Sequence, residues 1–376
     1  MRDIDLHIPP SALQKCLSKL MAEPFLILER LSLSFTVDET LGLILPKSFL
    51  APNLRHLTLI GVGLPKRLRL LSSTISLATL VLANIRASGY FRPRLLVSRL
   101  QLLPQLEELS IGFSIPIPRP SAERELLGKQ VTPVTLPNLK LVTFQGVSAY
   151  LDRLIAQIRA PLLERLDITL FCQIAFALPH LSHFIDITEG LKLSTAEIFL
   201  WSDMACVVLG HHSEGWYDRC FVLRVKCKQL DWQIHGAGQI CRELMPVLSG
   251  VEKLTLDFHE EMMSTEWQNS EIDDTTWHEL QLLRSFIGVK ELRICHSLSE
   301  ELSRALQVGE IMTDPGLLPD LQELISELRK GRTSGLFRSF IRARQVVGHP
   351  VRSLFSPLRP FLRLSPESLP IFSFGT

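Results

Sequence analysis

The sequence predicts an α/β fold of repeated units, in which short parallel strands are backed by helices. Three observations predict it: a recurring leucine phrase, a turn residue in front of each copy, and enough chain between copies for a helix. The clearest copy, residues 51–60, reads APNLRHLTLI, and related phrases begin at 103, 136, 160 and 318. Two further copies, at 250 and 288, begin with glycine instead of proline.

Each copy contains the L-x-x-L-x-L core of a leucine-rich repeat. Proline cannot continue a helix, and it favours extended backbone in the residue before it. The last two leucines are two positions apart and therefore lie on one face of a strand. Because one unit cannot bury this face alone, we expect residues 1–350 to stack into a leucine-rich-repeat solenoid, an irregular horseshoe of parallel short strands backed by helices.

The first apolar position of each copy sets the repeat spacing. The spacings run from 23 to 38 residues and are irregular, since leucine-rich repeats typically take about 20 to 29 residues. The copies at 193 and 220 are the weakest, because small or polar residues replace their leucines. The first positions are Leu28, Leu54, Leu77, Leu106, Leu139, Leu163, Leu193, Cys220, Val251, Val289 and Leu321.

Between the leucine phrases, helices and loops are expected from apolar periodicity and from glycine and proline. We expect a strand at 3–8, and amphipathic helices at 11–20, 90–103, 148–158 and 334–351. Residues 114–137 and 259–279 resemble loop insertions, and residues 351–376 a poorly ordered basic tail rich in proline and serine.

Composition favours a folded protein with a large core, because 46% of the 376 residues are hydrophobic and 21% are charged. The seven cysteines are scattered through apolar phrases, which favours buried, reduced thiols and an intracellular protein, cytoplasmic or nuclear. No apolar run approaches the length of a membrane span, and no apolar signal region opens the chain. We therefore expect no membrane span.

Two phrases near the end of the chain carry a resemblance to a known family. Residues 317–324 read LLPDLQEL, and residues 337–351 read FRSFIRARQVVGHPV. Together with the repeats, they resemble the leucine-rich-repeat region of the F-box proteins of mushroom-type fungi. The resemblance covers about residues 1–351 and implies a protein-interaction module, the substrate receptor of a cullin-RING ubiquitin ligase.

The same resemblance implies that an F-box should precede the repeats and bind the ligase core. No L-P-x-E-[IL] phrase typical of an F-box occurs before the first repeat. Binding of the ligase core is therefore expected only if an F-box lies upstream. The alternative is a free-standing leucine-rich-repeat scaffold with no link to a ligase.

Candidate catalytic and metal sites are weak. Residues 235–238 (HGAG) resemble an esterase oxyanion loop, but no G-x-S-x-G accompanies them, so a glycine turn is the better interpretation. Residues 259–263 (HEEMM) lack the second histidine of a zinc helix. His211, His212, Cys220 and Cys227 match no zinc spacing. We expect no enzyme activity, no catalytic residues, no metal and no cofactor.

A protein partner is the expected ligand, bound on the concave strand surface. Side chains next to the core leucines project there, and their charges are mixed, which favours protein over nucleic acid. Residues 329–363 hold nine Lys or Arg and no Asp or Glu, a charge that suits RNA, an anionic membrane or an acidic partner. A solvated helix face followed by a disordered tail is the better interpretation. The candidate partner-binding residues are Arg30, His56, Glu108, Arg165, Asp167, Lys253, Asp257, Glu291 and Arg293.

Overall fold

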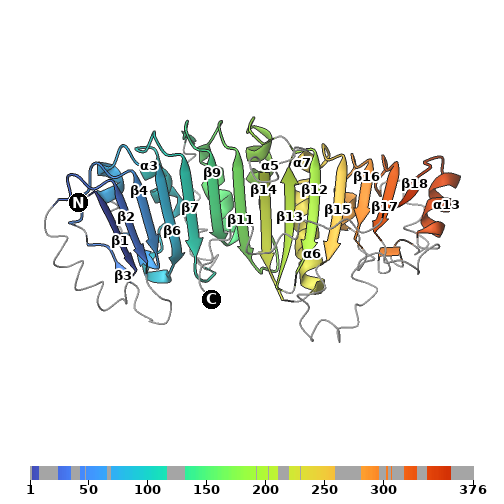
Figure 1. The fold of residues 1–376 in the computed structure, drawn as a ribbon, viewed down its shortest axis with the longest axis horizontal. Coiled ribbons are helices and arrows are strands. Elements are labelled where there is room, and N and C mark those ends of the chain that lie inside the picture. Colours follow the sequence, from blue (N-terminus) through green and yellow to red (C-terminus); the bar gives the residue numbers. More distant parts are fainter. Residues whose placement is uncertain are drawn as a thin grey trace. The chain divides into compact units, whose positions relative to one another are not determined.

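The protein is an α/β fold whose mostly parallel strands form two compact units (Figure 1). The first unit comprises residues 1–171, 187–190 and 365–376, and the second comprises 172–186 and 191–364. The computed structural model describes residues 2–7, 24–34, 43–46, 48–65, 69–116, 132–191, 193–201, 203–210, 220–228, 230–258, 281–295, 302–303, 306, 317–327 and 337–356.

The first unit contains one parallel sheet, with its strands in the order β1, β2, β4, β6, β7, β9 and β11. Two short parallel pairs, β3 with β5 and β8 with β10, lie outside that sheet. The elements are β1 Asp3–His7, β2 Arg30–Ser34, β3 Leu43–Ile44, β4 His56–Ile60, β5 Val62–Gly63, α2 Arg69–Ser73, β6 Thr79–Ile85, the 3₁₀ helix η1 Ala87–Gly89, α3 Pro93–Leu100, β7 Glu108–Phe113, β8 Val134–Thr135, β9 Leu141–Gly146, α4 Ser148–Ile155, β10 Ile158–Arg159 and β11 Arg165–Phe171.

One turn recurs in front of the strands of both units. The N–H of the first apolar position donates to the carbonyl three residues earlier, as from Leu54 to Ala51 at 3.1 Å. The strand begins two residues later. The predicted first positions that close this turn are Leu28, Leu54, Leu77, Leu106, Leu139, Leu163, Val251, Val289 and Leu321. The predicted repeat spacing is therefore confirmed at these positions.

The strands alternate as the leucine spacing requires. In β4, Leu57 and Leu59 are fully buried, whereas His56, Thr58 and Ile60 on the other face are half-buried. The helices cover the leucine side of each sheet (Figure 1). The predicted helices at 90–103 and 148–158 are α3 and α4, and α4 buries Tyr150, Leu151 and Leu154. The predicted strand at 3–8 is β1.

The second unit has a sheet in the order β14, β13, β12, β15, β16, β17 and β18. Within this sheet, the neighbouring strands β12, β15, β16, β17 and β18 pair in parallel. The elements are α5 Pro179–Asp186, β12 Thr195–Leu200, β13 Met204–Gly210, β14 Cys220–Lys226, α6 Leu230–Glu243, α7 Met245–Leu248, β15 Lys253–Phe258, α10 Gln281–Arg284, β16 Glu291–Ile294, β17 Glu323–Glu327, α13 Arg338–Val346 and β18 Arg352–Ser356.

At Cys220 the prediction is correct for a strand and wrong for its neighbour: β14 begins there, but it pairs antiparallel with β13, a strand that the sequence did not predict. β12, β13 and β14 form an antiparallel meander, in which Thr195 pairs with Gly210 and Gly210 with Cys220. Only residues 201–203 join β12 to β13, and Trp201 N–H donates to the Met204 carbonyl across this turn at 2.9 Å. A connection this short permits only an antiparallel neighbour, because a parallel one needs a crossover of a dozen residues or more.

Three other expectations are corrected. The HGAG segment lies inside α6, not in a turn, and a Cβ on Gly236 would be 3.3 Å from the Phe176 ring. Residues 352–356, expected in a poorly ordered tail, form β18 beside β17. Cys172 is exposed, although the other described cysteines are buried.

Several predicted segments lie outside the described residues. They are the helix at 11–20, the loop at 259–279 with its HEEMM phrase, most of the insertion at 114–137, residues 357–376, and both His211 and His212.

The phrase that carries the family resemblance has a clear structural role. Arg344 of α13 is buried and donates from Nη1 to the Leu317 carbonyl at 3.2 Å. Its Nη2 donates to the carbonyls of Leu318 and Pro319, each at 3.0 Å. These carbonyls belong to the turn before β17, where Leu318 has a φ of 48°. One arginine therefore fastens α13 to the last described turn of this type.

Candidate partner-binding face

The candidate site is the side of each sheet opposite the leucine core, here called the strand face. Strand residues alternate between the two sides, so every second residue of a strand belongs to this face. Parallel register then places equivalent residues side by side across neighbouring strands. All nine predicted residues lie on the strand face, four of them in one row of the first unit.

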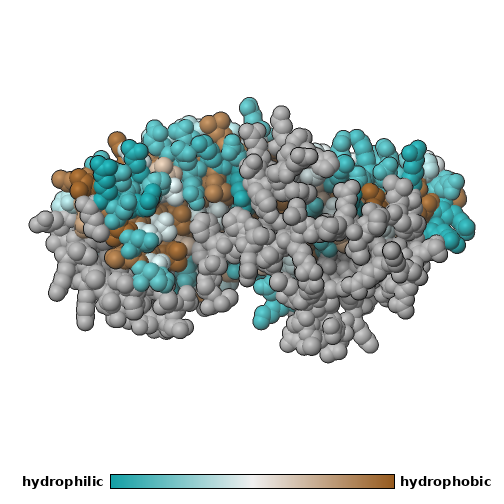
Figure 2. Space-filling model, viewed as in Figure 1, coloured by the Kyte–Doolittle hydropathy of each residue, from teal (hydrophilic) through white to brown (hydrophobic). Residues whose placement is uncertain are grey.

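That row crosses the first unit from β2 to β11. Its members occupy the first position of each strand, are exposed or half-buried, and differ in charge: Arg30, His56, Thr79, Glu108, Leu141 and Arg165. His56 Nδ1 and Thr79 Oγ1 are hydrogen-bonded at 3.2 Å. Partial burial raises the pKa of the Glu108 carboxyl above its usual value. Figure 2 shows hydrophilic and hydrophobic residues interspersed over this unit.

Arg165 and Asp167 form an ion pair within β11. Arg165 donates to Asp167 Oδ2 from Nη2 at 2.8 Å and from Nε at 3.1 Å. Asp167 is 5% exposed, and its Oδ1 is buried without a hydrogen-bond partner in the described structure. The sequence predicted both residues as partner contacts. Arg165 is half-buried and remains accessible to a partner, whereas Asp167 is buried and fixes the position of the Arg165 guanidinium.

The second unit has a linked set of charges on β15 and β16. Lys253 Nζ lies 3.1 Å from Glu291 Oε2, and Arg293 Nη2 lies 3.6 Å from Glu291 Oε1. All three side chains are half-buried. Because Lys253 and Glu291 share a row, the ion pair joins two neighbouring strands. Asp257, the fourth predicted residue here, lies four positions after Lys253 on the same face.

Glu197 of β12 belongs to this group and was missed from the sequence. It occupies the row of Thr255 and Arg293, with Asp257 on the adjacent strand. Burial and the nearby charge of Asp257 raise the pKa of Glu197 to about 7, and the opposite charge of Arg293 offsets part of this rise. A signal existed, because the spacing of Glu197 from the first position Leu193 equals that of Asp167 from Leu163.

Arg224 of β14 is the second residue missed. The residue is 6% exposed. Val225, the next residue, lies near Gly236 of α6, so Arg224 lies on the other face of the sheet. Its neighbours in the row are Cys206 and Phe199, both buried. Within the described part of the chain, neither Nε nor Nη2 of Arg224 has a hydrogen-bond partner. No feature of the sequence indicated this burial, because Arg224 alternates with core residues as a solvated strand residue does.

The strand face can bind a partner through ion pairs and hydrogen bonds, but its described residues offer no metal site. No group of three or more His, Cys, Asp or Glu in the described ranges is placed to hold a metal ion. No helix among these residues is long and apolar enough to cross a membrane.

No family model matches the sequence. A search of curated proteins finds no match either.

Proposed function

We propose that this chain is a protein-protein interaction module, a leucine-rich-repeat horseshoe that binds a protein partner on its strand face. The observation that carries the proposal is the row from Arg30 to Arg165, which register places across six neighbouring strands. A row of this kind gives a partner a continuous series of side chains from many repeats. Repeat proteins use such extended surfaces to bind partners.

The charges favour a protein partner over a nucleic acid. In the first unit, Arg30 and His56 are followed by Glu108, and in the second, Lys253 and Arg293 flank Glu291. A nucleic-acid surface needs clustered positive charge to neutralise phosphates. Alternating signs instead suit the mixed side chains of a protein surface and set the orientation of the partner.

The more specific form of the proposal is a substrate receptor of a cullin-RING ubiquitin ligase. It rests on the resemblance of residues 317–324 and 337–351 to fungal F-box proteins, and Arg344 gives those two phrases a shared structural role. The alternative is a free-standing scaffold with the same binding face. The two differ in whether cullin and its adaptor accompany the bound partner.

The test is affinity capture of the tagged chain from its own cell lysate, followed by mass spectrometry. The test variant combines Arg30→Glu with Lys253→Glu, one change on each strand face. The control combines Arg92→Glu with Arg159→Glu, which changes the net charge equally at exposed positions beside α3 and in β10. We expect the test variant to lose at least about tenfold of its captured partner and the control to retain it.

Equal losses in the two variants would contradict a role for the strand face. Recovery of cullin and its adaptor with the wild-type chain supports the ligase receptor. Their absence, while other proteins are retained, leaves the free-standing scaffold. Melting temperatures of both variants must match the wild type, since unfolded chains also lose partners.

A further inference from the structure

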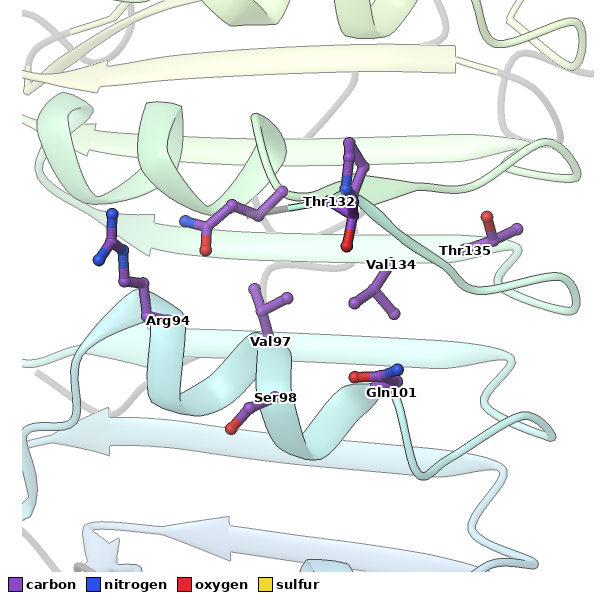
Figure 3. Close-up of a pocket in the computed structure, with 9 residues that line it drawn as sticks. Arg94, Val97, Ser98, Gln101, Thr132, Val134 and Thr135 are labelled. Atoms are coloured by element: carbon purple, nitrogen blue, oxygen red, sulfur yellow. The ribbon is translucent and has the colours of Figure 1, made fainter. Parts of the chain in front are cut away.

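A groove on the helix side of the first unit is separate from the strand face. Its volume is about 450 Å³, within the range of about 300 to 1,000 Å³ usual for ligand sites. α3 forms one wall, and the chain entering and forming β8 forms the other (Figure 3). Its lining includes Arg94, Val97, Ser98, Val134, Thr135 and Gln157.

The wall formed by β8 is an unpaired strand edge. Val134 N–H donates to the Gln157 carbonyl and Leu136 N–H to the Arg159 carbonyl, each at 2.8 Å, so these residues are bonded toward β10. Backbone groups of successive strand residues point in opposite directions. The N–H and C=O of Thr135 therefore point away from β10, and in the described structure they have no partner there.

A second polar group lacks a partner beside this edge. Gln157 uses its Nε2 to donate to the Arg153 carbonyl at 2.5 Å. Its Oε1 is buried and accepts no hydrogen bond within the described residues. Buried acceptors in native proteins are nearly always satisfied, by protein, water or a ligand. A ligand with N–H groups along one edge would satisfy Gln157 Oε1 and the Thr135 carbonyl.

The side chains define the chemistry of that ligand further. Figure 3 shows Arg94 at one end of the groove and Thr135 at the other, with Val97 and Val134 between them. Among the described residues that line the groove, Arg94 is the charged one. The groove thus presents a strand edge, a short apolar floor and one cation.

We propose that this groove binds an extended segment of a partner polypeptide, which adds as a third strand beside β8. Its backbone pairs with the N–H and C=O of Thr135, a small apolar side chain packs on Val97 and Val134, and an Asp or Glu side chain meets Arg94. Strand addition of this kind takes its affinity from main-chain hydrogen bonds and its specificity from flanking side chains. The groove is a second binding site, independent of the strand face.

The experiment pans a phage library of short random peptides on the intact chain. The dominant peptide is synthesised with a fluorophore, and its Kd is measured by anisotropy. Thr135→Pro removes the unpaired N–H without touching the bonds to β10, because those come from Val134 and Leu136. Thr135→Ala is the matched control, since it keeps the N–H and removes only the side chain.

We expect Thr135→Pro to weaken binding about tenfold or more, because it removes one main-chain hydrogen bond to the peptide. Thr135→Ala should change the Kd by less than about threefold. Arg94→Glu should weaken an acidic peptide by about tenfold as well. Ser98→Trp, on the exposed surface of α3, fills the groove and should abolish binding even if Thr135→Pro does not fold.

Two outcomes overturn the proposal. One is that no peptide is enriched on the intact chain above an unrelated control protein. The other is that enriched peptides bind the Thr135→Pro and Ser98→Trp chains as tightly as the wild type, which would place them elsewhere. In that second case, loss of binding in the strand-face variant alone supports the proposed function.

Discussion

The strand faces of the two units both arise from alternation along paired strands, but their residues differ in how far they are buried. In the first unit, half-buried polar residues such as His56 and Thr79 are hydrogen-bonded to one another across adjacent strands. In the second unit, residues on the strand face of β12, β13 and β14 are buried, among them Phe199, Cys206 and the charged Arg224. The difference teaches that equal spacing along the chain does not give equal exposure.

The cause is the antiparallel meander in the second unit. In the first unit the same turn precedes β2, β4, β6, β7, β9 and β11, so the polar residues of these strands fall on one half-exposed side. β13 and β14, in contrast, are buried on both sides over nearly their whole length. Glu197 and Arg224 therefore lie in a poorly solvated region, where an unpaired charge is costly.

The largest expected effect tests what the two units share, a buried inner row of leucines. Leu57→Ala should lower the free energy of unfolding by about 2 to 5 kcal/mol, because Leu57 is fully buried and a cavity remains. Thr58→Ala, at the next position but on the strand face, should cost less than about 1 kcal/mol. Urea denaturation measures both. Similar losses would mean that the two faces of β4 are not distinguished.

The next effect tests the end of the second unit. Arg344→Ala should cost about 3 kcal/mol, since it removes hydrogen bonds to three turn carbonyls from a buried guanidinium. Arg342→Ala, two residues earlier on the exposed side of α13, is the control and should be nearly neutral. An equal cost for both would remove the role assigned to Arg344.

The third prediction concerns pH and separates Glu197 from the carboxyls of the first unit. The pKa of Glu197 is raised from 4.5 to about 7 in the folded protein. As pH rises from 4.5 to 7, the unfolded chain loses this proton first, so stability should fall in that window, by on the order of 2 to 3 kcal/mol. Below pH 4.5 and above pH 7, this carboxyl does not contribute to the change of stability with pH.

Glu197→Gln is the control for that measurement, because the amide has the same shape and does not titrate. Urea midpoints of wild type and variant, measured at pH 4, 5.5, 7 and 8, should diverge only as the wild type loses stability. Parallel curves would show that Glu197 has an ordinary pKa and that this part of the strand face is well solvated.

The smallest expected effect is a gain. Arg224→Met should raise the free energy of unfolding by about 1 to 2 kcal/mol, because it replaces a buried guanidinium, two of whose nitrogens lack a hydrogen-bond partner among the described residues, with an apolar chain of similar length. Arg224→Lys keeps the charge and should give no gain. If the methionine variant is less stable than the wild type, Arg224 has a partner, and the contrast between the two strand faces narrows.

The sequence by itself determined the local structure of the parallel repeats. The position of each turn and strand follows from spacing of a few residues, as at Leu54, Leu57 and Leu59, and these contacts form within one repeat and its neighbour. The sides on which the nine candidate residues lie follow from the same alternation. Helices α3 and α4 were likewise predictable, because their apolar periodicity is local.

Only the tertiary structure decided where that pattern stops and which polar groups it buries. The meander at β12 to β14 pairs residues that are near in sequence, but the strand phrases do not specify whether a neighbouring strand runs parallel or antiparallel. Burial of Arg224 and the raised pKa of Glu197 depend on which elements surround them. The unpaired edge of β8 likewise exists only because β10, some two dozen residues later, pairs with its other side.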